Sequence, residues 1–443
     1  MSNYTPTTEK DIASMLNKLN MKKIDDLFDI IPEEFKFDID EIDISKSSTE
    51  FNVEKLMIGL SKQNMHANNS LCFMGGGAYD HYIPKIVDTL SSRSEFYTAY
   101  TPYQPEVSQG TLQYLYEFQT MLCDLSGMEI ANASLYDAAS AVAEACSMSI
   151  AVTRGNTILV SNEIHPSYRE LIDIYYKDKD ISIKTLKSTN GVTSVEDLKM
   201  KMNDDVASIV VQSPNYNGIL EDWSEISKYK LKSLLIAVSD PLSLSIIKSP
   251  GDSNCDVHVG EGQVLGNYMS YGGPYIGLFS TKMKYARKMP GRIIGRTKDM
   301  DGKEGFVMTL QTREQHIRRE RATSNICTNQ GLLALRATIY MALMGKEGIY
   351  NVANICFQNT QYALEQVKKL KNCKILYDTN NYIKEFVIEV NSSAKAIQLA
   401  ATKSNLLIDL IKNDLEDNKI LLAFTEKRTK EEIDSLINFL KTI

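Results

Sequence analysis

Side chains that could bind a small polar ligand gather in the stretch between Phe96 and Gln119. Prolines exclude its first part from a helix interior, and apolar residues recur at helical spacing from Leu112 onward. A stiff polar loop therefore leads directly into the start of a helix. Composition alone also fits a plain surface loop in which the prolines only set a turn. The side chains that could face one ligand are Thr98, Tyr100, Tyr103, Gln104 and Glu106.

A second candidate lies in the segment LCFMGGGAYDHYIP, residues 71–84. Three successive glycines permit a close backbone approach or a positive φ, which suits a turn that faces a ligand. The segment matches neither the dinucleotide-binding fingerprint nor a phosphate-binding loop, so it does not indicate a nucleotide site. His81, beside Asp80 and two tyrosines, is the candidate functional side chain. The alternative is a histidine held by ordinary hydrogen bonds.

The elements that would position these residues follow from the apolar pattern between residues 157 and 259. Short apolar runs alternate there with helix-length segments, which predicts a mostly parallel sheet with helices on both faces. Ligands of such sheets bind beyond the carboxyl ends of the strands. His165, Asp240 and Gln263 each follow an apolar run and are therefore candidates for one site. The predicted strands are Thr157–Val160, Ile181–Thr185, Ala207–Val211, Leu234–Val238 and Asp256–Val259.

A helix rich in small residues is predicted from Ala138 to Ala151, and it begins next to Ser134 and Asp137. The free N–H groups at its start could bind an anion or a phosphate. An ordinary buried alanine-rich helix fits the same pattern. Further along, MPGRIIGRTKDMDGKEGF (residues 289–306) is expected to be an exposed loop, and the interleaved charges of residues 313–321 are expected to pair with one another.

Length and composition set the broader organisation. A chain of 443 residues exceeds one core of about 250–300 residues. We predict an N-terminal helical arm (residues 1–60), a large α/β domain (61–330) and a small C-terminal α/β domain (331–443). The arm either wraps a partner subunit or is plain N-terminal decoration. Thr8 and Asp11 predict a capping box at its first helix, and Thr429 and Glu432 predict another at the last helix of the chain.

Charge and cysteine usage exclude several classes of function. The net charge of −7 argues against nucleic acid as a partner. Seven scattered cysteines without a C-x-x-C pair favour free thiols in a reducing compartment over disulfides or zinc, so no metal is expected. The sequence shows neither a targeting pattern at its N-terminus nor an apolar run of about 18 residues. It therefore predicts a cytoplasmic protein that does not bind membranes.

Several segments resemble the alpha subunit (subunit 1) of the two-subunit glycine dehydrogenase (decarboxylating), the P-protein of the glycine cleavage system. They span essentially the whole chain, and they are GGGAYDHYIP, EFYTAYTPYQPEVSQGTLQYLYEFQTM, IANASLYD, VGEGQVLG, SYGGPYIG, MPGR, LQTREQHIRRERATSNICTNQ and TEKRTKEEID. The resemblance implies the fold-type-I pyridoxal-phosphate transferase architecture. It also implies an alpha2beta2 enzyme that decarboxylates glycine and passes the aminomethyl group to the lipoyl arm of the H-protein, and that is active only with its beta subunit.

The resemblance further implies that pyridoxal phosphate is bound covalently by the beta subunit. In this chain the place of the Schiff-base lysine, eleven residues before Pro274, holds Gln263, which has no amine. Asp240 matches the carboxylate that pairs with the pyridine nitrogen, and His165 matches the ring-stacking position. With Ser134, Asp137 and Gln263, these residues would be remnants of a cofactor site. Ala138 stands where the family usually has glycine, which disfavours a phosphate in this subunit.

Three hypotheses follow. In the first, loops of this chain complete an active site on the beta subunit, with His81 and the residues between 98 and 106 orienting glycine or lining the path of the lipoyl arm. In the second, the chain is a structural subunit that stabilises the beta subunit and docks the H-protein. In the third, it is a self-sufficient pyridoxal phosphate enzyme that uses another lysine.

Overall fold

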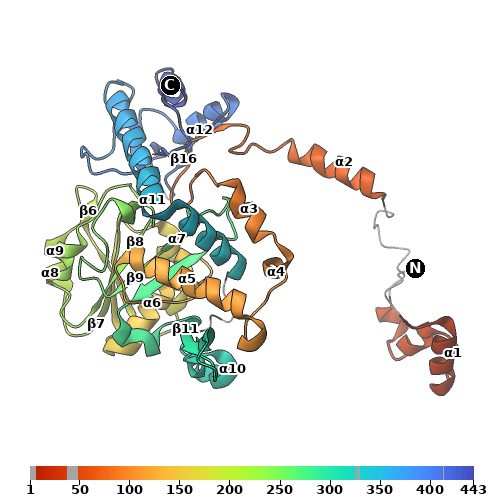
Figure 1. Ribbon diagram of the computed structural model, residues 1–443. Coiled ribbons are helices and arrows are strands. Elements are labelled where there is room, and N and C mark those ends of the chain that lie inside the picture. Colours follow the sequence, from red (N-terminus) through yellow and green to blue (C-terminus); the bar gives the residue numbers. More distant parts are fainter. Residues whose placement is uncertain (1–5, 37–47, 325, 327–329, 413) are drawn as a thin grey trace. The chain divides into compact units, whose positions relative to one another are not determined.

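The structure is a computed structural model that describes residues 6–36, 48–324, 326, 330–412 and 414–443 (Figure 1). The chain divides into two compact units, Met1–Met65 and His66–Ile443. Residues 1–5 and 37–47 of the predicted arm lie outside the described residues. Within the described part of the chain, none of the helices combines the length and apolar character needed to cross a membrane.

The N-terminal unit consists of short helices with open surfaces. They are α1 (Glu9–Lys18), η1 (Ile24–Phe28), η2 (Glu33–Phe35) and α2 (Glu50–Ser61), and none of their residues is buried. The predicted capping box is confirmed, because the Thr8 hydroxyl accepts from the Asp11 N–H while the Asp11 carboxylate accepts from the Thr8 N–H.

A seven-stranded sheet forms the centre of the second unit, in the order β2-β10-β9-β8-β7-β3-β4. β10 runs antiparallel to its two neighbours, and the other neighbouring pairs are parallel, so the predicted mostly parallel sheet is confirmed. The strands are β2 (Ile130–Ala131), β3 (Thr157–Ser161), β4 (Ser182–Leu186), β7 (Val206–Gln212), β8 (Leu234–Ser239), β9 (Val257–Glu261) and β10 (Gly277–Thr281).

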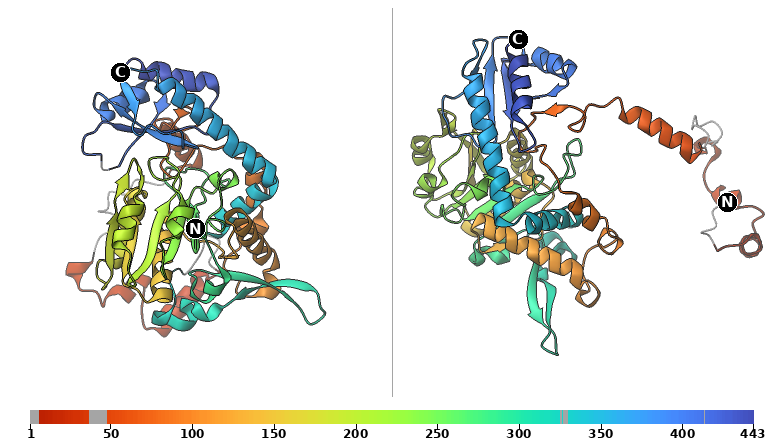
Figure 2. Two further views of the ribbon diagram at one scale, coloured as in Figure 1. Left: turned by 90° about the vertical axis from the view of Figure 1, so that its left-hand side faces the viewer. Right: turned by 45° about the horizontal axis from the view of Figure 1, so that its top comes forward.

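Helices cover both faces of this sheet (Figures 1 and 2). On one face, α6 and α7 join one side of the strands in a core that includes Val142, Val160 and Ile236. On the other face, α8 and α9 pack Leu198 and Trp223 against the opposite side of the strands. The helices of this unit that precede residue 320 are α3 (Lys85–Ser91), α4 (Ser94–Tyr97), α5 (Gln109–Ser126), α6 (Ala138–Thr153), α7 (Pro166–Tyr176), α8 (Val195–Lys201), α9 (Trp223–Ser227) and α10 (Gln315–Arg318).

A hairpin, β11 (Ile293–Lys298) paired with β12 (Glu304–Thr309), projects from the large sheet region (Figure 2). The expectation of an exposed loop for residues 289–306 was therefore wrong. The charged residues Arg296, Lys298 and Glu304 lie on this solvent-exposed ribbon, so the sequence shows little of the apolar alternation that marks a half-buried strand.

The C-terminal part begins with α11 (Gly331–Val367), which kinks at Gly345, where φ is 58° and ψ is −173°. It continues into a four-stranded antiparallel sheet in the order β13-β14-β17-β16, with its own core around Phe386 and Phe424. The elements are β13 (Cys373–Ile375), β14 (Glu385–Val390), α12 (Ala394–Lys403), β15 (Leu406–Leu407), β16 (Asp409–Leu410), β17 (Lys419–Ala423) and α13 (Lys430–Leu440). The predicted capping box of Thr429 and Glu432 is confirmed at α13.

The glycine-rich segment connects the two sheets. β1 (Leu71–Cys72) pairs with β15 of the C-terminal part, and Phe73 belongs to the C-terminal core. The chain then turns through Gly76 and Gly77, whose φ angles of 71° and 107° confirm that the glycine run provides backbone conformations other residues rarely adopt.

Candidate active site

The loop before α5 lies open at the surface, and all five of its candidate ligand-binding side chains are exposed. Tyr100 is 77% exposed and Tyr103 is 47% exposed. The loop contains one turn of 3-10 helix, η4 (Pro105–Val107), and α5 begins at Gln109, as the spacing predicted. The Gln109 amide donates to the Phe306 carbonyl over 2.9 Å and accepts from the Phe306 N–H over 2.8 Å. These bonds hold the end of the loop against the hairpin.

Tyr103 is held by charged residues from two later segments. Its hydroxyl accepts from Arg292 over 3.4 Å, and the Arg292 guanidinium lies 5.5 Å from the centre of its ring. The His316 ring approaches the same tyrosine edge-on at 5.3 Å, and the Glu314 carboxylate lies 3.5 Å from the Arg292 Nε. Arg292 is buried, so its guanidinium has a fixed position, and it holds the exposed Tyr103 through a contact with the ring.

Inside the second unit, Gln263 makes a buried contact that a lysine could not make. Its Oε1 accepts from the Tyr79 N–H over 2.9 Å, and its Nε2 donates to the Tyr79 carbonyl over 3.2 Å and to the Asn267 carbonyl over 2.8 Å. An ammonium group has no acceptor for the Tyr79 N–H. Gln263 therefore fixes the glycine-rich segment to the end of β9.

Asp240, which follows β8, forms a buried ion pair with Lys384, which directly precedes β14. The Lys384 Nζ lies 2.7 Å from the Asp240 carboxylate, and the two side chains are 4% and 11% exposed. The two charged groups touch without the alignment of a hydrogen bond. The same ammonium lies 4.2 Å from the centre of the Tyr79 ring. Lys384 thus supplies a positive charge where a pyridine nitrogen would meet Asp240.

Carboxyl groups of the chain occupy the N-terminus of α6. Asp137 caps the helix by accepting from the Ser140 N–H over 2.7 Å, and Glu261 accepts from the Ala138 N–H over 3.1 Å. Burial raises the pKa of Glu261 to about 8, and nearby Asp137 adds to the rise. The Ser134 hydroxyl accepts from a backbone N–H in the segment before α11. The predicted anion site is therefore taken by internal acidic groups.

The histidine in the ring-stacking position is also enclosed by neighbours. The His165 ring stacks on Tyr168, with ring centres 4.7 Å apart, and meets Tyr216 edge-on at 4.9 Å. Burial lowers the pKa of His165 to about 4, so the ring is neutral at pH 7. Its Nδ1 accepts from the Ser167 N–H over 3.1 Å at the start of α7.

Asp240, Lys384, Glu261 and Tyr168 line a small cavity of about 30 Å³. A pyridoxal phosphate would need a lysine, a phosphate site, an unpaired carboxylate and an open ring face. In this chain Gln263 stands in place of the lysine, and Glu261 occupies the phosphate site. The Lys384 ammonium pairs with the Asp240 carboxylate, and Tyr168 covers the ring face of His165. The residues of this chain therefore do not fit the cofactor. The cavity is lined by Gly77, Tyr79, Tyr168, Gln212, Pro214, Val238, Ser239, Asp240, Glu261, Lys384 and Glu385.

The structure thus separates the predicted site residues into two groups. Asp240 lines this small cavity, and Gln263 and His165 contact two of its lining residues, Tyr79 and Tyr168. Asp137 caps α6 beside Ala138, whose N–H bonds Glu261 of the lining, whereas the candidate side chains between 98 and 106 lie on the surface. His81 belongs to neither group, because it is buried and its Nδ1 lies 2.6 Å from the Glu426 carboxylate. Sequence reasoning missed Lys384 and Arg292, although a lysine directly before an apolar strand was a visible signal for the first.

Solved structures with a similar fold include distant enzymes. A NifS-like protein from Rickettsia africae aligns with a TM-score of 0.62 at 15% identity, covering 84% of this chain and 99% of that chain. A glutamate decarboxylase from Lactobacillus brevis aligns with a TM-score of 0.68 at 11% identity, covering 92% and 96%. These neighbours are fold-type-I pyridoxal-phosphate-dependent enzymes, so the predicted fold class is confirmed.

Closer similarity extends over the full length of the chain. A crystal structure of glycine decarboxylase (P-protein) of the glycine cleavage system, in inhibitor-bound form, aligns with a TM-score of 0.91 at 36% identity and covers 100% of both chains. Proteins described as probable glycine dehydrogenase (decarboxylating) subunit 1 are 44% identical over 441 residues in Desulforamulus reducens and 43% identical over 444 residues in Chloroherpeton thalassium. These alignments cover 98% and 99% of each pair of chains. Since the family model for the glycine cleavage system P-protein also matches residues 2–440, the chain belongs to that family, as its sequence motifs indicated.

Proposed function

We propose that this chain is subunit 1 of a glycine dehydrogenase (decarboxylating) and works only with a second subunit. The pair would decarboxylate glycine and transfer the aminomethyl group to the lipoyl arm of the H-protein. The observation that supports this division of roles is the small cavity lined by Lys384, Glu261 and Tyr168, which leaves no place for a cofactor on this chain. Full-length similarity to proteins named as subunit 1 supports the reaction.

The cofactor belongs, in this proposal, to the second subunit. Gln263 replaces the Schiff-base lysine, and the other anchor points for pyridoxal phosphate hold groups of the chain itself. The second subunit would therefore carry the catalytic site, whereas the corresponding residues of this chain would only support its fold. The chain's own contribution must come from surfaces that reach the partner's site.

The exposed loop of residues 98–106 is the proposed contribution. Tyr103 presents a hydroxyl and a ring edge that buried Arg292 holds in place, and Tyr100, Gln104 and Glu106 are exposed beside it. Such groups can orient glycine or line the path of the lipoyl arm without forming a covalent bond. Fixing a substrate in this way lowers a reaction barrier by several kcal/mol. His81 is left out of this surface because its ring is directed at Glu426.

The N-terminal unit supplies a surface for the partner. Phe51, Leu56 and Met57 of α2 are 71%, 60% and 58% exposed, and Val53, Ile58 and Leu60 of the same helix are exposed as well. Exposed apolar side chains gathered on one element usually mark an interaction site. The exposed apolar residues support the interpretation that the arm wraps the second subunit in an alpha2beta2 assembly. The free thiols among the described cysteines support a reducing, cytoplasmic location.

The decisive experiment compares the purified chain, the purified second subunit and their complex. We expect glycine–bicarbonate exchange only from the complex, with one pyridoxal phosphate for each pair of subunits. Exchange by this chain alone, or two cofactors for each pair, would overturn the proposal and favour a self-sufficient enzyme.

A structural subunit that only stabilises its partner and docks the H-protein is separated from this proposal by two conservative variants. Tyr103→Phe and Glu106→Gln should each lower kcat/KM of the complex by about tenfold or more, because a hydrogen bond to a charged group is worth roughly 1.5–3 kcal/mol. Tyr97→Phe, at an exposed tyrosine just upstream, is the matched control and should leave turnover unchanged. Unchanged turnover in all three complexes would favour the structural role.

A further inference from the structure

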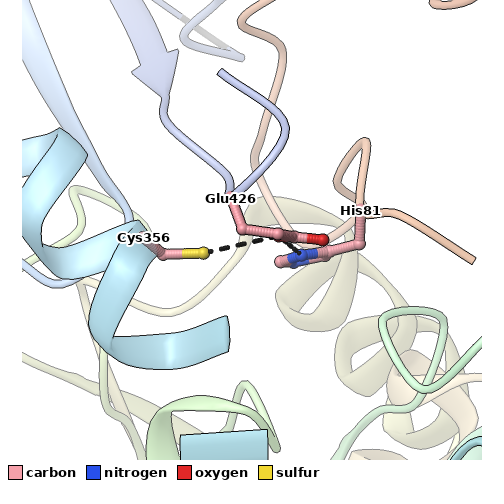
Figure 3. Close-up of side chains that lie close together, drawn as sticks. All are labelled: His81, Cys356 and Glu426. Carbon is pink, nitrogen blue, oxygen red and sulfur yellow. Dashed lines mark hydrogen bonds and ion pairs between the residues drawn. The ribbon is translucent and has the colours of Figure 1, made fainter. Parts of the chain in front are cut away.

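Three side chains that can bind metal ions converge outside the lining of the small cavity but close to it, since the His81 ring centre lies 6.1 Å from that of Tyr79 (Figure 3). His81 comes from the segment after the glycine run, Cys356 from the second half of α11, and Glu426 from the segment after β17. One ligand atom from each lies within 4.8 Å of the other two. His81 is 7% exposed, Cys356 is 0% exposed, and the Glu426 side chain is 11% exposed.

The ligand atoms of His81 and Cys356 both contact the Glu426 carboxylate. The His81 Nδ1 lies 2.6 Å from the Glu426 Oε2, and the Cys356 Sγ lies 3.7 Å from the same oxygen. In a tetrahedral zinc site with bonds of about 2.0–2.3 Å, ligand atoms are about 3.3–3.6 Å apart. The sulfur–oxygen separation of 3.7 Å lies just above this range, and the nitrogen–oxygen separation of 2.6 Å reaches it after a shift of about 0.7–1 Å.

Two polar atoms in the same region have no hydrogen-bond partner among the described residues. They are the Nε2 of His81 and the hydroxyl of Tyr340, and Tyr340 is only 1% exposed. Burial, followed by the nearby Glu426 and Cys356, raises the pKa of Tyr340. Buried polar atoms without partners are uncommon and are usually satisfied by a water or a ligand.

Within the cluster the Glu426 carboxylate faces the His81 ring, and the ammonium of Lys384 is close enough to act on Cys356. The neighbouring Lys427 and Arg428 are paired with Asp80, at 2.6 Å and 3.4 Å, so Asp80 balances them without Glu426. A divalent cation would balance the Glu426 carboxylate and a Cys356 thiolate together. A thiolate with an imidazole and one carboxylate is a donor set for zinc, whereas magnesium and calcium take oxygen ligands.

We propose that His81, Cys356 and Glu426 form a zinc site with three protein ligands. The metal would fasten the glycine-rich segment to α11 and to the segment after β17, three parts of the chain that are far apart in sequence. Its role would be structural, and it would hold Tyr79 near Gln263 and Lys384. The proposal does not depend on the reaction of the enzyme.

The test uses the full chain, stripped with a chelator and then titrated with Co²⁺ as a spectroscopic probe. Wild type should bind one Co²⁺ with a thiolate-to-cobalt absorption band, and added Zn²⁺ should displace it. Cys356→Ser should abolish the band and weaken zinc binding by more than about 100-fold, since even groups that only hydrogen-bond to a metal's ligands are worth about 10–100-fold in affinity. Cys146→Ser, which replaces a buried thiol among apolar side chains, should keep both the absorption band and the affinity for Zn²⁺.

Glu426→Gln covers the case in which the cysteine variant does not fold. It should keep the absorption band, because the thiolate remains, but lower the affinity for Zn²⁺ by at least about tenfold. Absence of a band in wild type, or an equal loss in the two cysteine variants, would show that the three side chains are only a hydrogen-bonded cluster and would overturn the proposal.

Discussion

The ion pair of Lys384 with Asp240 gives the sharpest test of how the cavity is filled. Replacing Lys384 by methionine keeps most of the side-chain volume but removes the ammonium. It leaves the Asp240 carboxylate buried without its positive partner and also removes the contact of the ammonium with the Tyr79 ring. Losing one partner of a buried pair costs about 3–5 kcal/mol, and the two side chains are too deeply buried for solvent to screen the loss.

We therefore expect Lys384→Met to lower the free energy of unfolding by about 3 kcal/mol, the lower value because the pair is not aligned as a hydrogen bond. Urea unfolding followed by far-UV circular dichroism measures this change. The matched control is Lys412→Met, which removes a pair with Glu170 at 2.8 Å whose side chains are 42% and 52% exposed. This control should cost at most about 1 kcal/mol.

A double variant completes the argument. Adding Asp240→Asn to Lys384→Met removes both charges, so it should recover most of the lost stability. The reasoning is refuted if Lys384→Met costs no more than the surface control, or if the double variant is less stable than the single one.

Three further predictions concern other parts of the molecule. Gln263→Lys should lower the free energy of unfolding by about 1–3 kcal/mol, because the Tyr79 N–H loses its acceptor, and it should give no cofactor absorbance when pyridoxal phosphate is added. Glu261 has a folded-state pKa of about 8, above its ordinary 4.5, so its contribution to stability is complete below about pH 4.5 and is lost as the pH rises through 8. Glu261→Gln should flatten the melting temperature between pH 5 and 8, and an unchanged slope would contradict this. Phe51→Glu with Leu56→Glu should leave the chain's own stability within about 0.5 kcal/mol but weaken its association with the second subunit in sedimentation velocity, and undiminished association would remove α2 from the interface.

Local rules predicted the fold well where neighbouring residues decide the structure. The capping boxes of Thr8 and Thr429 depend on residues three positions apart, and the buried strands are continuous apolar runs. The hairpin of β11 and β12 was missed because its pairing is decided across an exposed ribbon whose charged residues hide the alternation. Strand pairing of this kind is set by the partner strand rather than by local composition.

The site was only partly predictable for the same reason. Asp240 and Gln263 were found because both follow apolar runs at one edge of the sheet. Their partners, Lys384 and Tyr79, come from distant segments, and nothing in local spacing indicates that they meet. The cluster of His81, Cys356 and Glu426 was invisible too, since metal-site patterns read from a sequence depend on closely spaced ligands.

The paired and hydrogen-bonded groups around the cavity limit which single substitutions this chain can tolerate there. A pyridoxal phosphate site on this chain would require a lysine at Gln263, a neutral residue at Lys384, and the withdrawal of Glu261 and the Ala138 side chain from the start of α6. Each change made alone leaves a buried charge or a broken hydrogen bond, so intermediates are less stable than either end state. The internal contacts therefore disfavour the stepwise gain of a cofactor site by this chain.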